Sequence, residues 1–321
     1  MRSRSYYFLI LAIALLVLGG CEKKESQQFR IGTNVWPGYE GLYLAEHKGF
    51  FEGANIRLVP YPSASTASQD FRSGLLEAIA LTMDEALFLA SEKVDFKIIM
   101  IFDISHGGDM LIAAKGIKSM AQLKGRRVAL ESSALGAYML SRALDHTGLK
   151  LEDIVPLNMQ LNQHEKVMMD GEADAVVTFD PVSTRLLSAG YNKLFDSSQI
   201  PGEIVDVLLV RTEFLENNPG AVEKLLSGYF RAMQYQKENF DESIQFMATR
   251  EAVSPEQFKD SLKGLIIPDL AENKRMLGAG QAQLVKTFYK LMQVMQGHKL
   301  LFSPVEPEKL IDAGPIQKLS Q

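Results

Sequence analysis

The chain has 321 residues, of which 46% are hydrophobic, and its 39 acidic residues against 34 basic ones give a formal charge of −5. Because it contains no basic run and no stripe of basic and aromatic residues, the sequence argues against nucleic acid as a partner. The length suffices for two modest hydrophobic cores or for one large core.

The first residues predict a signal peptide of the lipoprotein kind. A short basic start precedes the apolar run Phe8–Leu18, which falls short of the roughly 20 residues that span a membrane. The run leads through two glycines to Cys21, the only cysteine, and this string resembles a bacterial lipobox. We therefore expect cleavage after residues 1–20, a lipid anchor on Cys21, and a polar tether over 21–28, as in an exported, membrane-anchored lipoprotein. An ordinary signal peptide beside an incidental cysteine is the alternative.

Short β-rich runs alternate with helical patterns from Phe29 to about Thr212. This alternation predicts an α/β fold with parallel sheets covered by helices on both faces. The expected strands are Phe29–Val35, Ile56–Tyr61, Ala78–Leu81, Phe96–Phe102, Asp109–Ala114, Arg127–Leu130, Ile154–Gln160, Ala173–Phe179 and Asp206–Val210. The expected helices between them are Gly41–Phe51, Ser65–Gly74, Asp84–Ser91, Leu135–His146, Gln163–Asp170 and Pro181–Ala189. Only helical patterns follow, and these extra C-terminal helices are expected to pack on an existing lobe: Leu215–Asn239, Ser243–Arg250, Pro255–Leu262 and Gln281–Met295.

Two polar joints predict where the chain crosses between two lobes. Residues 103–109 connect two apolar runs and contain paired glycines, which tolerate unusual backbone angles. Residues 200–206 lead back into a strand. Two crossings predict a hinge, with lobe 1 formed by residues 29–106 plus 206–321 and lobe 2 by residues 107–205.

Polar and aromatic side chains follow several of the expected strands. Ligands bind beyond the carboxyl ends of the strands of an open parallel sheet, where helix N-termini also lie. N-capping, which contributes about 1 kcal/mol, explains any single serine or aspartate there, but it does not explain the collective pattern. Trp36, the only tryptophan, lies in a Pro-Gly turn, which favours contact with a ligand over packing in a core. The candidate ligand-binding residues are Trp36, Tyr39, Ser63, Ser65, Thr82, Asp84, Asp103, His106, Ser132, Ser133, Phe179 and Asp180.

Three stretches, at residues 36–51, 123–130 and 171–181, resemble the nitrate/sulfonate/taurine (NMT1/THI5-like) class of ABC-transporter solute-binding proteins. The resemblance runs from about Phe29 to Leu270. It implies a type II periplasmic-binding-protein fold, a small ligand held between the lobes, and an ABC permease in the membrane as partner. It also implies a monomer without a cofactor. A lipoprotein that reports its ligand to a membrane signalling partner, and a small-molecule enzyme on the same fold, are the alternatives.

Acidic residues crowd the predicted cleft, and no arginine accompanies them. They are Asp84, Glu85, Asp103, Glu131 and Asp180. Since carboxylates repel a simple anion, this balance favours a ligand that carries an amine or is zwitterionic. Two alternatives remain open: the acids cap helices or face solvent, or hydroxyl groups at helix N-termini bind an oxyanion.

No enzyme motif stands out, so no catalytic residue is predicted. The chain lacks a Gly-x-Ser-x-Gly elbow and a phosphate-binding loop, and His164-Glu165 lacks the second histidine of a zinc protease helix. Asp103, His106 and Asp109 have a spacing compatible with a metal, but spacing alone is weak evidence. No metal site is therefore predicted.

Overall fold

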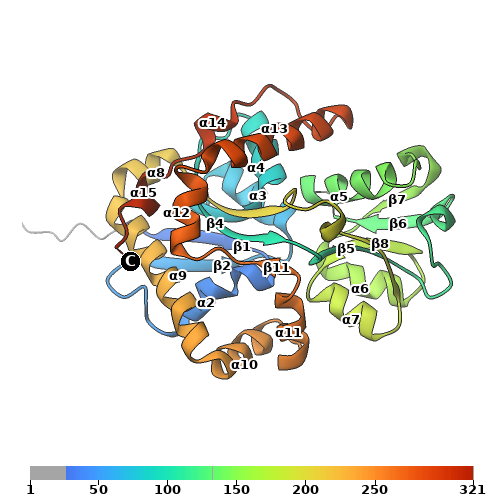
Figure 1. Ribbon diagram of the computed structural model, residues 1–321, viewed down its shortest axis with the longest axis horizontal. Helices are drawn as coiled ribbons and strands as arrows, with labels where there is room; N and C mark the ends of the chain where they lie inside the picture. The colour runs from blue at the N-terminus through green and yellow to red at the C-terminus, as the bar shows by residue number, and fades with distance from the viewer. Residues whose placement is uncertain (1–26, 132, 321) are drawn as a thin grey trace, which may run out of the picture.

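The structure, a computed structural model, describes residues 27–131 and 133–320. The chain forms two separate sheets that lie side by side, each with helices on both faces (Figure 1). The predicted signal peptide, Cys21, most of the tether and Ser132 lie outside the described residues. Within those residues, no helix is both long and apolar enough to cross a bilayer.

Lobe 1 is built on a six-stranded sheet with the order β11-β4-β10-β3-β1-β2. Its strands are β1 (Phe29–Thr33), β2 (Ile56–Pro60), β3 (Ala78–Thr82), β4 (Lys97–Ser105), β10 (Val205–Val210) and β11 (Leu265–Ile266). Lobe 2 is built on a five-stranded sheet with the order β7-β6-β8-β5-β9. Its strands are β5 (Asp109–Ala113), β6 (Arg127–Leu130), β7 (Val155–Asn158), β8 (Ala175–Phe179) and β9 (Asn192–Asp196).

Both sheets are mixed, so the prediction of parallel sheets is wrong for β10 and β11 in lobe 1 and for β5 in lobe 2. β10 runs antiparallel to β3 and β4, and β5 runs antiparallel to β8 and β9. The reason is topological, because β5 and β10 are the first strands after the two crossings. Each begins at the edge of its sheet that faces the other lobe. Its neighbours end at that edge: β3 and β4 beside β10, and β8 beside β5.

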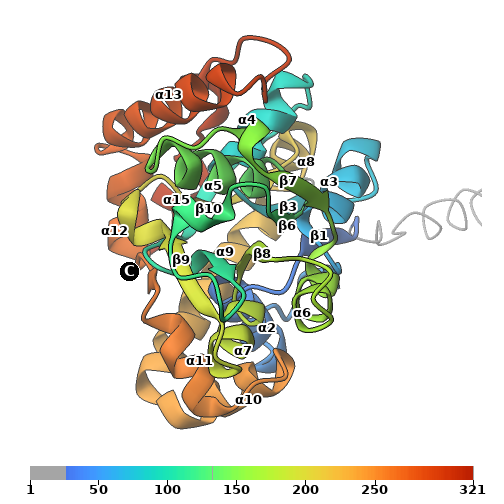
Figure 2. The same ribbon diagram turned by 90° about the vertical axis from the view of Figure 1, so that its right-hand side faces the viewer.

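Helices cover both faces of each sheet. Figure 2 shows α5 on one side of the lobe 2 strands and α6 and α7 on the other. The helices that alternate with strands are α2 (Glu40–His47), α3 (Ala64–Ser73), α4 (Met83–Ser91), α5 (Ala134–Asp145), α6 (Leu161–Met169) and α7 (Val182–Ser188). The C-terminal helices pack on lobe 1 and are α8 (Thr212–Asn217), α9 (Pro219–Glu238), α10 (Phe240–Arg250), α11 (Pro255–Leu262), α12 (Leu270–Leu277), α13 (Gln281–Gly297), α14 (Pro307–Leu310) and α15 (Gly314–Gln317).

The helix predicted over Leu215–Asn239 is two helices. The chain breaks at Asn218, whose backbone lies outside the helical region, and α9 begins with Pro219. Proline is well suited to the first position of a helix because its missing N–H has no helical partner there. Hydrophobic periodicity continues across this break, so the pattern alone does not reveal it.

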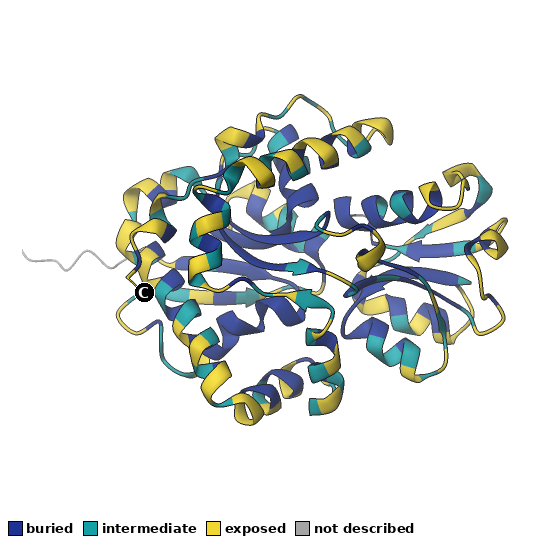
Figure 3. Cartoon of the chain, in the orientation of Figure 1, coloured by how far each residue is buried: buried dark blue, intermediate teal, exposed yellow. Residues whose placement is uncertain are grey.

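The central strands are buried on both faces, as Figure 3 shows in dark blue. Every residue of β3, β8 and β10 is buried. Strands covered on both sides appear in the sequence as nearly continuous apolar runs rather than as alternating patterns. A polar residue at the end of such a strand is therefore exceptional, and these residues lie at the edges where the two lobes meet.

The chain crosses between the lobes at residues 106–108 and 197–204. The crossings contact one another, since Ser197 Oγ accepts from the Gly107 backbone N–H at 2.7 Å and lies 2.8 Å from Ser105 Oγ. Gly107 has a φ of +115°, which only glycine adopts readily. The two crossings thus form one hydrogen-bonded joint between the sheets.

Candidate ligand-binding site

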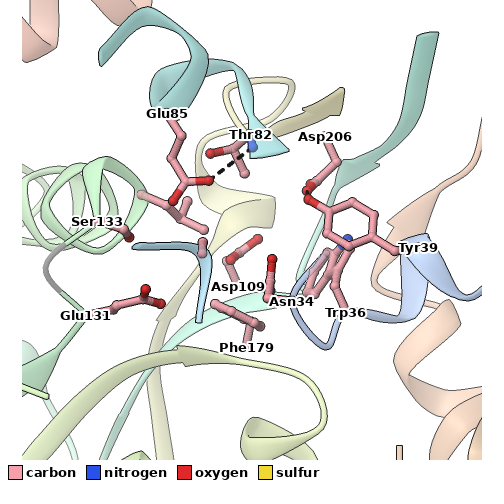
Figure 4. Close-up of a pocket in the computed structure, with 12 residues that line it drawn as sticks. Asn34, Trp36, Tyr39, Thr82, Glu85, Asp109, Glu131, Ser133, Phe179 and Asp206 are labelled. Carbon is pink, nitrogen blue, oxygen red and sulfur yellow. Dashed lines mark hydrogen bonds between the residues drawn. The ribbon is translucent and has the colours of Figure 1, made fainter. Parts of the chain in front are cut away.

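A cavity lies between the two lobes, where the edges of both sheets face each other (Figure 4). Its free volume is about 20 Å³, enough for about one water molecule. Side chains from both lobes therefore nearly fill it in this closed arrangement. The lining residues are Asn34, Trp36, Tyr39, Ala64, Thr82, Glu85, Asp109, Glu131, Ser133, Leu135, Phe179 and Asp206.

Three neighbouring strands of lobe 1 present a polar row at this edge. In the antiparallel pairings of β10, Asp206 lies opposite Thr82 of β3 on one side and opposite Asp103 of β4 on the other. All three residues are buried. Like charges directly opposite each other in a sheet are destabilising, so the pair Asp103–Asp206 favours a shared proton or an added cation.

Aromatic residues that follow β1 hold these carboxyl groups. The indole Nε1 of Trp36 donates to Asp103 Oδ2 at 3.0 Å, and the Tyr39 hydroxyl donates to Asp206 Oδ1. The Trp36 ring meets the Phe179 ring of lobe 2 edge to face, with the centroids 5.5 Å apart. A side chain at Gly38 would place its Cβ 1.8 Å from Asp103 Oδ2, so the turn after Trp36 requires glycine for this close approach.

Two glutamates form the other side of the cavity, and each also accepts from a backbone N–H at a helix N-terminus. Glu85 Oε2 accepts from the Thr82 N–H at 3.2 Å, where α4 begins. Glu131 of lobe 2 accepts from the Ser65 N–H at 2.8 Å, in the first turn of α3 of lobe 1. The second contact joins the two lobes. Both donors, which are of the kind that would bind an oxyanion, are thus already occupied by the chain's own carboxylates.

Several buried oxygen atoms at the cavity have no hydrogen-bond partner among the described atoms. Buried acceptors without a hydrogen bond are rare in proteins, and each one costs about 1–3 kcal/mol of folding free energy. Those that belong to the lining residues Thr82, Glu85, Asp109 and Asp206 are therefore available to a ligand that donates hydrogen bonds. The whole set comprises Thr82 Oγ1, both carboxylate oxygens of Asp84, Glu85 Oε1, Asp103 Oδ1, Asp109 Oδ2 and Asp206 Oδ2.

The carboxyl groups hold protons more tightly than usual because they are buried together. Burial, with further repulsion from neighbouring acids, raises the pKa of Asp109 to about 7. Burial also raises the pKa of Asp206 well above its ordinary value, and Asp103 adds to this rise. The pKa of Glu85 is raised by burial and then by Asp84 and Glu131. No lysine or arginine lines the cavity among the described residues, so the acids have no fixed counter-ion.

The structure brings some of the predicted ligand-binding residues together. Asp103 lies directly behind Trp36, and Asp84 is buried next to Glu85 without lining the cavity. Those that line the cavity are Trp36, Tyr39, Thr82, Ser133 and Phe179.

Other predicted residues make hydrogen bonds at the starts of helices. Ser63 caps α3 by accepting from the Thr66 N–H at 3.3 Å, and Ser133 caps α5 as well as lining the cavity. Asp180 Oδ1 accepts from the Ser183 hydroxyl and from the Thr184 hydroxyl, each at 2.6 Å, so this carboxylate is directed into α7. Ser65 donates its backbone N–H to Glu131, and its hydroxyl lies 3.1 Å from the Ser63 hydroxyl.

His106 lies on the crossing with its side chain exposed, away from the buried Asp103 and Asp109. Across the described ranges, no group of three histidine, cysteine or acidic side chains is arranged to hold a metal ion.

Sequence reasoning missed two acidic residues near the starts of β5 and β10. Asp109 begins β5, and Asp206 is the second residue of β10; both line the cavity. The rule that sites lie after the carboxyl ends of parallel strands does not find them. Their one signal in the sequence is an acid at the point where each predicted crossing meets an apolar run. Asn34, Ala64 and Leu135 were also absent from the candidates.

A family model described as NMT1/THI5 like matches residues 36–243, more than half of the chain. A Bacillus subtilis protein named for binding aliphatic sulfonates is 23% identical over 73% of this chain and 75% of its own length. The taurine-binding periplasmic protein of Escherichia coli is 24% identical over 57% of this chain and 58% of its own length.

Solved structures show the same fold. The alkanesulfonate-binding protein of Xanthomonas axonopodis pv. citri, bound to MOPS, superposes with a TM-score of 0.76 at 18% identity and covers 90% of this chain and 99% of its own. A desulfurization enzyme superposes with a TM-score of 0.66 at 15% identity and covers 90% of this chain and 98% of its own. These matches confirm the predicted fold of two α/β lobes, with both crossings, and the resemblance on which it rested.

Proposed function

We propose that this chain, which belongs to the NMT1/THI5-like family, is an exported solute-binding lipoprotein that captures a small amine-bearing ligand and delivers it to an ABC permease. The names of its relatives support the solute-binding part, since they are binding proteins for sulfonates and taurine. The lipobox at Cys21 supports the anchor. Residues 29–106 plus 206–321 and residues 107–205 act as the two lobes, which open and close about the joined crossings.

The acidic lining of the cavity is the observation that supports an amine-bearing ligand. Glu85, Asp109, Glu131 and Asp206 line it, and Asp103 lies behind Trp36, while no basic side chain among the described residues compensates them. An anion such as a simple sulfonate would meet these carboxylates in a buried space of low dielectric constant. An ammonium group would instead donate to acceptors that lack partners. A ligand that carries a positive amine, alone or as part of a zwitterion, fits this cavity.

A binding screen tests the proposal. The purified protein is melted in the presence of amines, amino acids and sulfonates, and compounds that raise the melting temperature are titrated by calorimetry. We expect amines to bind and sulfonates without an amine to leave the melting temperature unchanged. In the variant Asp206→Asn the affinity for the amine should fall about 10- to 100-fold, because a charge-assisted hydrogen bond is lost. Tight binding of a simple sulfonate, with none of any amine, would refute the proposal.

A further inference from the structure

The acids of the cavity fall into two groups. The inner group is Asp103, Asp109 and Asp206, beside the aromatic rings. The outer group is Glu85 and Glu131, which face each other from the two lobes at the opposite side of the view in Figure 4. Burial raises the pKa of both Asp206 and Glu85; among the neighbouring acids, Asp103 adds most to the rise for Asp206 and Asp84 to that for Glu85, while Glu85 also adds to the rise for Asp206, so the two groups adjoin.

The outer group also lines a second, larger hollow. Glu85, Glu131 and Ser133 belong both to the cavity and to a hollow of about 510 Å³ between α3, α4 and α5. The two glutamates thus lie at the boundary between the hollow and the cavity. A ligand that reaches from the inner group towards the hollow passes between them.

One ammonium group cannot serve both groups. It has three N–H donors, all directed from one nitrogen atom. Unpartnered carboxylate oxygens belong to Asp109 and Asp206, which line the cavity, to Asp103 next to Trp36, and to Glu85 in the outer group. Two ammonium groups, one for each set of acids, provide N–H donors for the unpartnered oxygens of both sets.

Apolar side chains complete the argument. Ala64, Leu135 and Phe179 line the same cavity, and all three are buried. Because the closed cavity admits only about one water, a longer ligand enters as the lobes part and extends into the hollow of about 510 Å³, and these side chains then contact its hydrocarbon chain. A zwitterion fits less well, because the lining offers its negative end no basic side chain among the described residues.

We infer that the ligand is a linear dication, an alkyl diamine or polyamine, with one ammonium group held by Asp103, Asp109 and Asp206 and the other held between Glu85 and Glu131. The inference rests on the proposed capture of an amine and adds the number of charges and their order along the cavity. The aromatic walls formed by Trp36 and Phe179 lie at the inner end.

Calorimetric titration with matched amines tests it. A series of α,ω-diaminoalkanes is compared with monoamines of the same chain length on the whole protein. At least one diamine should bind about 10- to 100-fold more tightly than its monoamine, the ratio expected for one more charge-assisted contact. The variant Glu85→Gln should remove this preference by weakening the diamine alone. Its amide oxygen still accepts from the Thr82 N–H, and its melting temperature should be at or above that of wild type.

The control is Glu272→Gln on α12, where Glu272 pairs with Arg275 and neither residue lines the cavity or the hollow. This variant should keep the preference for diamines. If every diamine binds no better than its monoamine, the dication is wrong and the capture of amines stands. If Glu85→Gln weakens both compounds equally, the assignment of the outer group is wrong. If no amine binds, both the inference and the proposed amine ligand fail.

Discussion

Replacing Asp109 by asparagine removes a buried, titrating carboxyl group and should change how stability depends on pH. Burial raises the pKa of Asp109 from its ordinary 3.8 to about 7, so the folded state holds this proton more tightly than the unfolded chain. The stability that this carboxyl contributes is complete below its unfolded pKa and is lost as the pH rises through about 7. Asparagine has a similar shape and never ionises, so its contribution does not depend on pH.

The size of the effect follows from the pKa. From pH 5 to the pKa of about 7 there are two pH units, and each corresponds to about 1.4 kcal/mol. The difference in unfolding free energy between Asp109→Asn and wild type should therefore grow by about 3 kcal/mol in favour of the variant from pH 5 to pH 8. In domains of this general size, about 1 kcal/mol shifts the melting temperature by roughly 2–4 °C. A relative shift of about 6–12 °C is expected.

Thermal melts of the ligand-free protein at several pH values measure this difference. The control is Asp174→Asn, because the hydrogen bond from Arg127 lowers the pKa of Asp174, which stays ionised from pH 5 upwards. Its difference from wild type should not change over the same range. Comparing each variant with wild type also removes the opposite contribution of His164, whose pKa burial lowers to about 4. A constant difference for Asp109→Asn would refute the reasoning.

Three further predictions concern separate parts of the chain. Cys21→Ser should abolish metabolic labelling with a fatty acid, and unlabelled wild type would contradict the lipobox assignment. Trp36→Phe removes the indole donor to a buried carboxylate and should weaken amine binding about 10-fold, while in wild type the ligand should change the tryptophan emission. A fall in melting temperature with unchanged affinity would instead indicate a packing role. Glu203→Gln breaks the ion pairs of the buried Glu203 with Arg142 and with the exposed Lys290 and should destabilise the protein by about 2 kcal/mol in thermal melts. An unchanged melting temperature would count against the pairing.

Much of the fold was accessible from the sequence because the apolar runs are long and clearly bounded. β1, β2, β3, β4, β6 and β8 lie within or close to their predicted ranges. Strand direction was not accessible, since an apolar run reads the same in either orientation. β9 and β11 were missed: β9 is largely polar in sequence, and β11 has two residues.

The cavity was only partly predictable, for two physical reasons. Residues that follow the predicted parallel strands, such as Trp36 and Thr82, were found because their backbone position alone places them at the edge. Asp206 was not, because it reaches the same edge at the start of an antiparallel strand. The role of Asp180 depends on rotamer and hydrogen bonding, and its orientation into α7 leaves no trace in the spacing of the sequence.

The chain shares its fold with proteins named for sulfonates, and the helix N-termini suggest how the same architecture accommodates the amine-bearing ligand proposed here. In this fold they supply N–H donors at the meeting edge of the lobes, which suits an oxyanion. Here the donors of Ser65 and Thr82 are occupied by Glu131 and Glu85, each through one carboxylate oxygen. The remaining oxygen of Glu85 is left without a partner among the described atoms. At these two helix starts, the chain's own carboxylates therefore occupy the N–H donors and present acceptors to the cavity.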